Sequence, residues 1–311
     1  MSQKILFTIE KFMYRGILLS LIASCLFGLV YYYPVLLRPL SVVDIFCWRL
    51  MMSFPAILLL ILIERQWSAI TELLQRIRQQ PLFLLALIFS AILIAIQMLI
   101  FVWAPLAGRA LSTSLGYFML PLTMVVCGRV VYKERFSFLQ KIAVGLAFSG
   151  VILEVYLTGA FSWETIVISL GYPIYFVFRR KMRIDGIAGT FSDFFFIALA
   201  CLIYFMIQYP TSKIVSDMAH FPIYIPLLGI ITAIAFAAYF SASRMLPLGI
   251  FGLLGYVEPI LLAIVSIVFL HETISPNHII SYGLIWSAVC MLVIEGLTTT
   301  IRNIKRKRIN A

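Results

Sequence analysis

The sequence predicts an all-α membrane protein with ten transmembrane helices, arranged as two five-helix repeats of inverted topology. Three observations lead to this prediction. The composition is too apolar for a water-facing surface, and apolar stretches recur along the chain. A similar sequence motif also occurs in each half. Helices are favoured because lipid offers the backbone no hydrogen-bond partners outside the segment itself.

The composition indicates that much of the surface faces lipid. The chain has 311 residues, of which 63% are hydrophobic and 12% are charged, and its mean hydropathy is +1.05. Soluble domains carry about 25% charged residues. This chain therefore has too few charges to cover a surface in water.

Apolar stretches of membrane-spanning length follow one another along the chain. A spanning helix needs about 20 mostly apolar residues. The alternation of apolar and polar residues that a membrane β-barrel requires does not appear. The predicted helices cover residues 14–36, 43–63, 82–104, 109–131, 136–156, 161–179, 190–209, 223–243, 248–270 and 276–296.

The lysine and arginine residues indicate on which side of the membrane each loop between the predicted spans lies. Most of the 24 basic residues fall at the N-terminus, in every second joint and in the C-terminal tail, residues 297–311. Arg38, Arg49, Arg109 and Lys213 fall on the opposite side. By the positive-inside rule both termini are cytoplasmic. We interpret the tail as an orientation signal attracted to anionic lipid, and expect no nucleic-acid binding.

The two halves share a phrase that begins SLGYFMLPL at residue 114 and LLGYVEPIL at residue 253. An offset of 138 residues pairs Pro121 with Pro259, Glu134 with Glu272, Ser137 with Ser275, and Gly145 with Gly283. The period is five helices, and because five is odd the second copy enters the membrane from the opposite side. Such inverted repeats are typical of alternating-access transporters. We therefore predict one repeat at 1–157, a second at 158–296, and the tail at 297–311.

Glu258 is the first candidate functional residue, because charges inside a bilayer are costly. It lies well inside the predicted span 248–270, directly before Pro259, which removes a backbone donor. Its candidate role is a substrate or proton site whose protonation gates movement. The alternative is a buried structural carboxylate that is hydrogen-bonded to a tyrosine.

Arg49 and Asp193 enter the second and seventh predicted spans, at roughly corresponding places in the two repeats. Each is a candidate for binding an oppositely charged group of a substrate, or for gating. The alternatives are snorkelling of the side chain towards the headgroups and an ion pair that holds helices in register.

We predict that Glu134 and Glu272 stabilise helix ends. Each precedes a helix start: Ser137 begins a Ser-x-x-Gln capping-box spacing, and Ser275 precedes a proline at the first helical position. A carboxylate there accepts hydrogen bonds from exposed N–H groups at the positive end of the helix dipole.

Catalytic and metal-binding patterns are absent from the sequence. The three histidines lie near span ends, the five cysteines form no CxxC pair, and no HExxH, nucleotide-binding loop or nucleophile elbow occurs. We expect no enzyme activity, no metal and no cofactor. The energy for any transport would come from an ion gradient, from exchange or from the gradient of the solute.

Four stretches carry a family resemblance. KERFSFLQKIAVGLAFSGVIL and HETISPNHIISYGLIWSAVCMLV each resemble the end of an EamA domain of the drug/metabolite transporter superfamily. WRLMMS at 48–53 and IQMLIFVWAPLAG at 96–108, with the two Leu-Gly-Tyr phrases, resemble its RarD-like branch. Gln97-Met98 and Gly255 depart from that branch, where Asn-Trp and a glutamine or serine are typical.

The resemblance implies a secondary carrier, expected to be an exporter of amino acids, metabolites or drugs in a bacterial inner membrane, as a monomer or homodimer. It also implies a central pocket with aromatic and polar walls, which suit amphipathic solutes. Packing explains each candidate for those walls equally well. The candidates are Gln97, Trp103, Tyr117, Tyr239 and Tyr256.

The expected partners are a small-molecule substrate, membrane lipid and a coupling proton. Two alternatives remain open at this point. A nucleotide-sugar or organophosphate carrier would need several basic residues in the cavity, and a non-transporting membrane scaffold would have a dry, fully packed centre.

Overall fold

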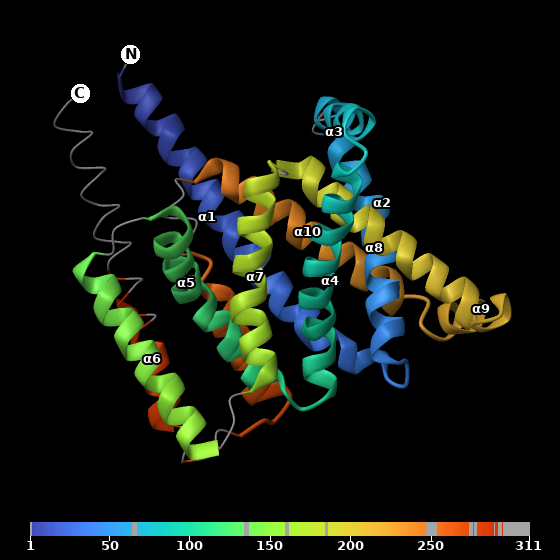
Figure 1. Ribbon diagram of the computed structural model, residues 1–311. Helices are drawn as coiled ribbons and strands as arrows, with labels where there is room; N and C mark the ends of the chain where they lie inside the picture. The colour runs from blue at the N-terminus through green and yellow to red at the C-terminus, as the bar shows by residue number, and fades with distance from the viewer. Residues whose placement is uncertain are drawn as a thin grey trace. The chain divides into compact units, whose positions relative to one another are not determined.

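The structure is a computed structural model, and regular structure in the residues that it describes is helical, with no strand among them (Figure 1). Those residues are 2–63, 67–133, 137–158, 162–183, 186–246, 254–273, 276, 279–288, 290–291 and 294.

Most helices in the first half begin and end close to the predicted spans, but the first helix begins at Ser2, well before the predicted residue 14. Helix α1 (Ser2–Tyr32) continues into the 3-10 helix η1 (Tyr33–Leu37). The other elements are α2 (Val42–Ile63), α3 (Trp67–Gln79), α4 (Phe83–Leu106), α5 (Ala110–Tyr132), α6 (Phe138–Thr158), α7 (Trp163–Met182), α8 (Gly186–Gln208), α9 (Thr211–His220), α10 (Tyr224–Met245) and α12 (Val257–Ile264), which continues as the π-helix η2 (Val265–Phe269). Residues Ile279–Ala288 form a further helix.

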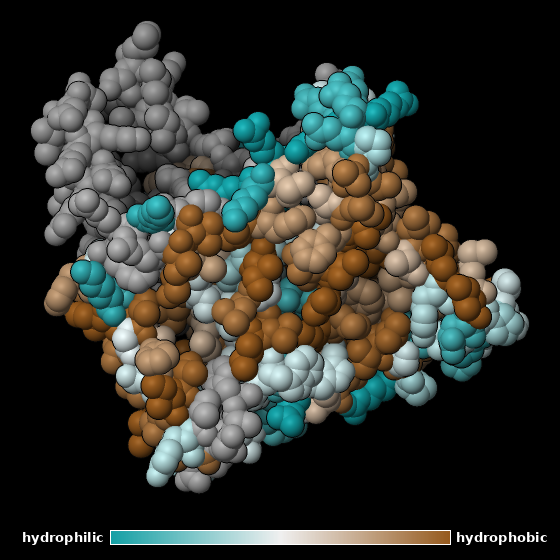
Figure 2. All heavy atoms as spheres, viewed as in Figure 1, coloured by the Kyte–Doolittle hydropathy of each residue, from teal (hydrophilic) through white to brown (hydrophobic). Residues whose placement is uncertain are grey.

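Several helices are long and apolar enough to cross a membrane. Among the described residues there are five, or six if α9 and α10, which meet at a bend of 79°, form one broken crossing. Their outer faces are apolar (Figure 2), as at Ile207 of α8, which is 80% exposed. Exposed apolar surface of this extent indicates contact with lipid. The protein is therefore a multi-pass membrane protein, while the count of ten crossings stays a prediction.

Two helices lie where we expected polar joints. Helix α3 follows the second predicted span, and α9 follows the seventh. Both are short and amphipathic: α3 buries Ile70 and carries Arg76 and Arg78 in its last turn. A search for long apolar stretches misses such helices because one face of each is polar.

The expectation of one continuous helix over 248–270 is wrong within the residues that the structure describes. The chain turns at Gly255 and Tyr256, and α12 begins at Val257. Glycine is a poor helix former, and proline is tolerated in a first turn, where its missing N–H has no helical acceptor. Glu258 and Pro259 therefore lie at the start of a helix and not in its middle.

The chain divides into two compact units, each described separately. Unit 1 contains Met1–Gly28, Gly108–Pro173 and Ala238–Ala311; unit 2 contains Leu29–Ala107 and Ile174–Ala237. In unit 1, α5 packs against α6 and α12. In unit 2, α2, α4 and α8 pack against one another, and α3 lies at one end of α4 and α8 (Figure 1).

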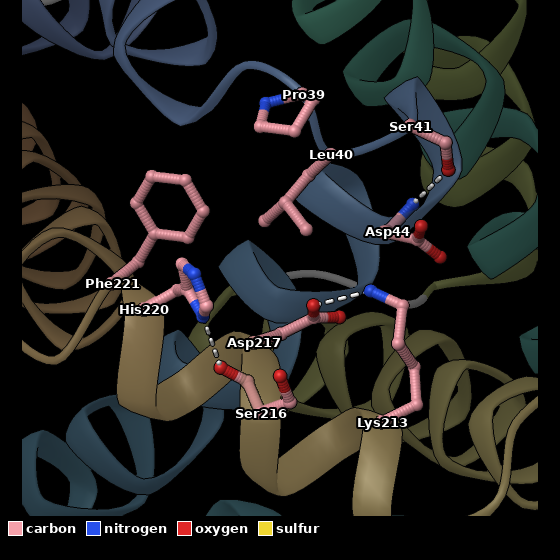
Figure 3. A pocket seen from close by; sticks show the side chains of 9 residues that line it. All are labelled: Pro39, Leu40, Ser41, Asp44, Lys213, Ser216, Asp217, His220 and Phe221. Atoms are coloured by element: carbon pink, nitrogen blue, oxygen red, sulfur yellow. Dashed lines mark hydrogen bonds and ion pairs between the residues drawn. The ribbon is translucent and has the colours of Figure 1, made fainter.

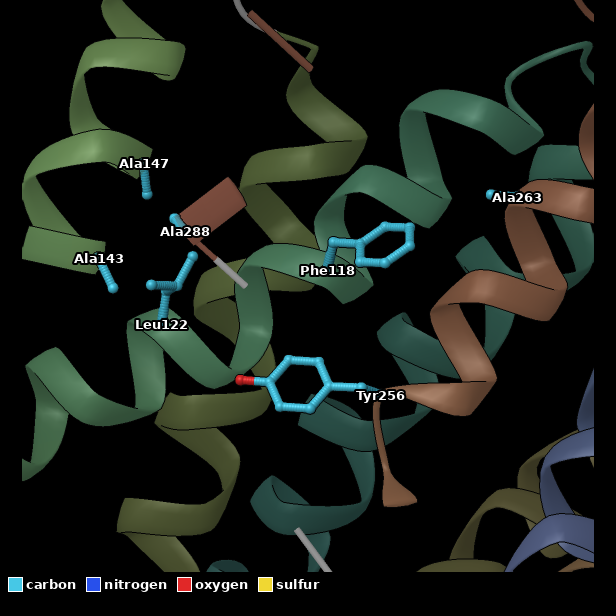
Figure 4. Packing of buried hydrophobic residues seen from close by; sticks show 7 residues of the cluster. All are labelled: Phe118, Leu122, Ala143, Ala147, Tyr256, Ala263 and Ala288. Atoms are coloured by element: carbon cyan, nitrogen blue, oxygen red, sulfur yellow. The ribbon is translucent and has the colours of Figure 1, made fainter. Parts of the chain in front are cut away.

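Small residues allow the helices within each unit to approach closely, as is typical of membrane proteins. In unit 2 a Cβ atom at Gly229 of α10 would lie 2.2 Å from the Cβ atom of Met52 of α2. The core of unit 1 combines alanines with larger apolar side chains (Figure 4). Its buried residues are Phe118, Leu122, Ala143, Ala147, Tyr256, Ala263 and Ala288.

Candidate functional site

Arg49 is a deeply buried charged residue of α2. Only 3% of it is exposed, which does not fit the snorkelling alternative. Its Nε donates a hydrogen bond to Thr232 Oγ1 of α10 at 3.2 Å, and its guanidinium lies 5.2 Å from the centre of the Phe101 ring of α4. A cation above an aromatic face is attracted by the ring quadrupole. Contacts from two other helices thus hold Arg49 inside unit 2.

Gln97 lies one helical turn before Phe101 on α4, so both side chains share a face of that helix. Gln97 is 2% exposed, and its Oε1 has no hydrogen-bond partner among the described residues. A buried amide oxygen without a partner is costly, so this atom is a candidate contact for a polar ligand. Trp103, further along α4, is partly exposed.

Asp193 of α8 forms a buried ion pair with Arg179 of α7, with 3.2 Å between Asp193 Oδ2 and Arg179 Nη1. Tyr175 donates its hydroxyl to the same carboxylate oxygen at 2.8 Å, and Arg179 donates to that hydroxyl. This geometry matches the alternative of an ion pair that joins two helices. Sequence reasoning missed Arg179 because it stands among the basic residues of a predicted joint.

A glutamate and three tyrosines come together in unit 1. The hydroxyl oxygens of Tyr117 of α5 and Tyr172 of α7 lie 3.4 Å apart, and their ring centres are 5.8 Å apart. Tyr239 of α10 interacts electrostatically with both Tyr172 and Glu258. The ring of Phe27 meets Tyr239 edge-on at 6.2 Å. We name Glu258, Tyr239, Tyr172 and Tyr117 the carboxylate–tyrosine cluster.

Tyr172 was not among the predicted site residues, although the sequence carries a signal for it. It ends a Leu-Gly-Tyr phrase before a proline, as do Tyr117 and Tyr256 in the two repeats. The structure places Tyr256 elsewhere: its side chain is buried in the apolar core of unit 1, near Phe118 and Leu122 (Figure 4). Tyr256 therefore has a packing role in this arrangement.

Glu272 lies at the start of a helix, as predicted for a helix-end residue. That helix is α5, and not the helix that follows Glu272 in the sequence. Its two carboxylate oxygens accept hydrogen bonds from the N–H groups of Ala110, at 2.8 Å, and Leu111, at 2.7 Å, which open α5. Ser137 and Gln140 form the predicted capping box at the start of α6, with reciprocal bonds of 3.0 and 3.1 Å. Glu134 and Ser275 lie outside the described residues.

A second carboxylate lies near the start of α5. Glu164, in the first turn of α7, is fully buried, and its Oε1 lies 3.7 Å from Nη1 of the largely exposed Arg109. Neither carboxylate oxygen has a hydrogen-bond partner among the described residues. Residues Arg109–Leu111 thus meet two carboxylates from two other parts of unit 1.

A cleft of about 480 Å³ lies in unit 2 beside α9 (Figure 3). None of the predicted site residues lines it. Its charged groups bond to neighbours: Lys213 pairs with Asp217, and the carboxylate of Asp44 accepts hydrogen bonds from the hydroxyls of Tyr204 and Tyr209. Local structure therefore accounts for these side chains. No group of three or more metal-ligating residues occurs in the described part of the chain.

Comparison with known proteins finds one family and several full-length relatives. The EamA-like transporter family matches residues 14–156 and 164–294. The chloramphenicol-sensitive protein RarD of Pseudomonas aeruginosa is 42% identical over 280 residues, covering 89% of this chain and 93% of that protein. An uncharacterized transporter of Pasteurella multocida is 37% identical over 293 residues, covering 94% and 100%.

A more distant relative and a solved structure extend the likeness. Protein RarD of Escherichia coli is 28% identical over 295 residues, covering 94% of this chain and 98% of that protein. A crystal structure with 15% sequence identity gives a TM-score of 0.52 and covers 91% of this chain and 98% of that chain. At that identity the likeness concerns the fold alone.

Proposed function

Because the chain belongs to the EamA-like transporter family, with RarD proteins among its relatives, we propose that it is a secondary transporter that exports small organic solutes across the bacterial inner membrane. The observation that carries the proposal is the carboxylate–tyrosine cluster of unit 1. Glu258 is an ionisable residue in an apolar helix, and such residues typically mark substrate or proton pathways.

The proposed topology has ten crossings, with both termini in the cytoplasm and repeats at 1–157 and 158–296. Its support is the distribution of basic residues and the phrase repeated at an odd period of five helices. Cysteines introduced after residues 158 and 273 should react with an impermeant reagent in intact cells. Protection of either position would contradict this topology.

The cluster suits solutes that combine an amino or hydroxyl group with an apolar body. Glu258 lies in the first turn of α12, directly after the break at Gly255 and Tyr256. Transporters commonly bind substrates where a helix is interrupted, since the exposed backbone groups there add polar contacts. The tyrosine rings offer apolar walls and the hydroxyls offer hydrogen bonds. We propose that Glu258 binds the solute and a coupling proton in turn.

Unit 2 offers a separate set of groups for acidic solutes. The guanidinium of Arg49 and the side-chain amide of Gln97 are the proposed contacts for a carboxylate or phosphate. The planar guanidinium can form two parallel hydrogen bonds to such a group. Asp193, paired with Arg179, has a proposed gating role in which this ion pair breaks and re-forms.

The test begins with the purified protein and a library of amino acids, metabolites and drugs. Compounds that raise the melting temperature are then followed in liposomes, with and without an imposed proton gradient. The proposal expects at least one such compound to cross faster than in protein-free liposomes. A Glu258→Gln protein serves as the matched control. If no stabilising compound crosses faster than in protein-free liposomes, the proposal is wrong.

A further inference from the structure

Helix α3, the start of α4 and the end of α7 meet at one end of unit 2. Leu73 and Ile77 of α3 and Met182 of α7 pack against an apolar cluster that contains Phe83 and Leu87 of α4. The guanidinium of Arg76 lies 3.8 Å from the centre of the Phe83 ring. Its Nη1 donates a hydrogen bond to the carbonyl oxygen of Arg183 at 3.2 Å. These contacts bring the turn after α7 next to α3.

Positive charge is concentrated where these elements meet. The basic junction consists of Arg76, Arg78, Arg180, Lys181 and Arg183, and of these all except Arg76 are exposed. Figure 2 shows the hydrophilic surface over α3. The sequence of α3 contains a single acidic residue, Glu72. The junction therefore carries a large excess of positive charge on a small area.

Apolar surface lies directly beside these charges. Leu74 of α3 is 51% exposed, and Trp67, seven residues earlier on the same helix face, is also exposed. Leu82, just before α4, is 79% exposed. A cleft of about 370 Å³ lies between Met182 and the segment Gln80–Phe83.

We propose that the basic junction is a binding site for an anionic phospholipid. The phosphate contacts Arg78, Lys181 and Arg183, while an acyl chain lies along Leu82 and Met182. Charge complementarity selects the headgroup, and the apolar surface distinguishes a lipid from a free phosphate ion. Helix α4, which is of membrane-spanning length, begins at this place. An amphipathic helix at such a level lies in the membrane interface.

The proposal does not depend on the transported solute, so lipid binding can be measured on the purified full-length protein. Native mass spectrometry would count phosphatidylglycerol and phosphatidylcholine retained from mixed micelles. The test variant is Arg78→Gln with Lys181→Gln, because both side chains are exposed. The matched control is Arg15→Gln with Lys141→Gln, which removes the same charges from exposed positions in unit 1.

Wild type should retain phosphatidylglycerol in preference to phosphatidylcholine. Each basic residue near a lipid surface changes affinity about fivefold, so the test variant should bind phosphatidylglycerol about 30-fold more weakly. The control should change much less. A further variant, Leu82→Ser, should weaken retention while leaving its salt dependence unchanged, since that residue contributes apolar contact to the acyl chain.

Three results would overturn the proposal. The first is equal retention of the two lipids by wild type. The second is an equal loss in the control, which would mean that charge anywhere on the protein attracts lipid. The third is displacement of phosphatidylglycerol by an equal concentration of soluble glycerol phosphate, which would make the junction a phosphate site.

Discussion

Asp193 and Arg179 form a buried ion pair between α8 and α7, with their closest charged atoms 3.2 Å apart. Tyr175, one turn before Arg179 on α7, shares hydrogen bonds with both partners. Removing one charge from such a pair leaves the other buried and unpaired, and this costs far more than the pair itself contributes. Each residue of the pair therefore depends on the charge of the other to remain stable inside the protein.

Asp193→Asn should lower the free energy of unfolding by about 3–5 kcal/mol, because Arg179 loses its counter-charge inside the protein. Adding Arg179→Gln should restore part of that loss. The measurement is chemical unfolding in detergent followed by circular dichroism. Asp217→Asn, which breaks the more exposed pair with Lys213, is the control and should cost about 0–1 kcal/mol. Equal losses in the two single variants would contradict the prediction.

Glu272→Gln should lower stability by about 0.5–2 kcal/mol, the usual contribution of a helix cap and a charge at a helix start. The amide keeps one acceptor oxygen but loses the charge and the second acceptor for the N–H groups that open α5. Melting temperature is the measure, and Glu72→Gln on the exposed face of α3 is the control. A variant with the wild-type melting temperature that no longer binds substrate would make Glu272 a site residue.

Gly229→Ala should destabilise unit 2 by about 1–3 kcal/mol, the usual effect of overpacking. The added methyl group would meet both the side chain and the backbone of Met52, so α2 and α10 would have to separate. Gly145→Ala is the control, since a Cβ atom there meets nothing within 4 Å. That change should stabilise α6 by about 0.5–1 kcal/mol. The prediction fails if both variants shift unfolding in the same direction.

Glu258→Gln should separate solute exchange from uphill transport. The amide keeps the size and hydrogen bonding of the carboxyl but cannot carry a proton, so counterflow should persist while gradient-driven flux is lost. Both fluxes are measured in liposomes across a range of pH. If gradient-driven flux and its pH profile are unchanged, Glu258 is a packing residue.

The apolar spans could be predicted because membrane helices depend mainly on local composition. The predicted span 43–63 differs from α2 by one residue at its start, and the predicted span 109–131 differs from α5 by one residue at each end. Helix α3 was missed, although Trp67, Ile70, Leu74 and Ile77 follow a helical spacing, because no apolar stretch of spanning length includes them. The break before Val257 was missed because apolar content alone does not locate helix ends.

The candidate site was less predictable because its contacts join distant parts of the chain. Glu258 was identified from its chemistry and position, whereas Tyr239 was a candidate only through the family resemblance. Nothing local indicates that Tyr172 lies beside Tyr117, or that the carboxylate of Glu272 belongs to the start of α5. The capping box of Ser137 could be predicted because both of its bonds lie within four residues.

The bonds from Glu272 to the start of α5 also affect how the protein is made. Leu111 and its acceptor are 161 residues apart, so α5 is synthesised long before the carboxylate that caps it. At about 5–20 residues per second, the ribosome needs roughly ten to thirty seconds to reach residue 272. During that interval the N–H groups of Ala110 and Leu111 must bond to water, lipid headgroups or the insertion machinery. A nascent chain released within this window would carry an uncapped helix into the membrane, where quality-control proteases could recognise it.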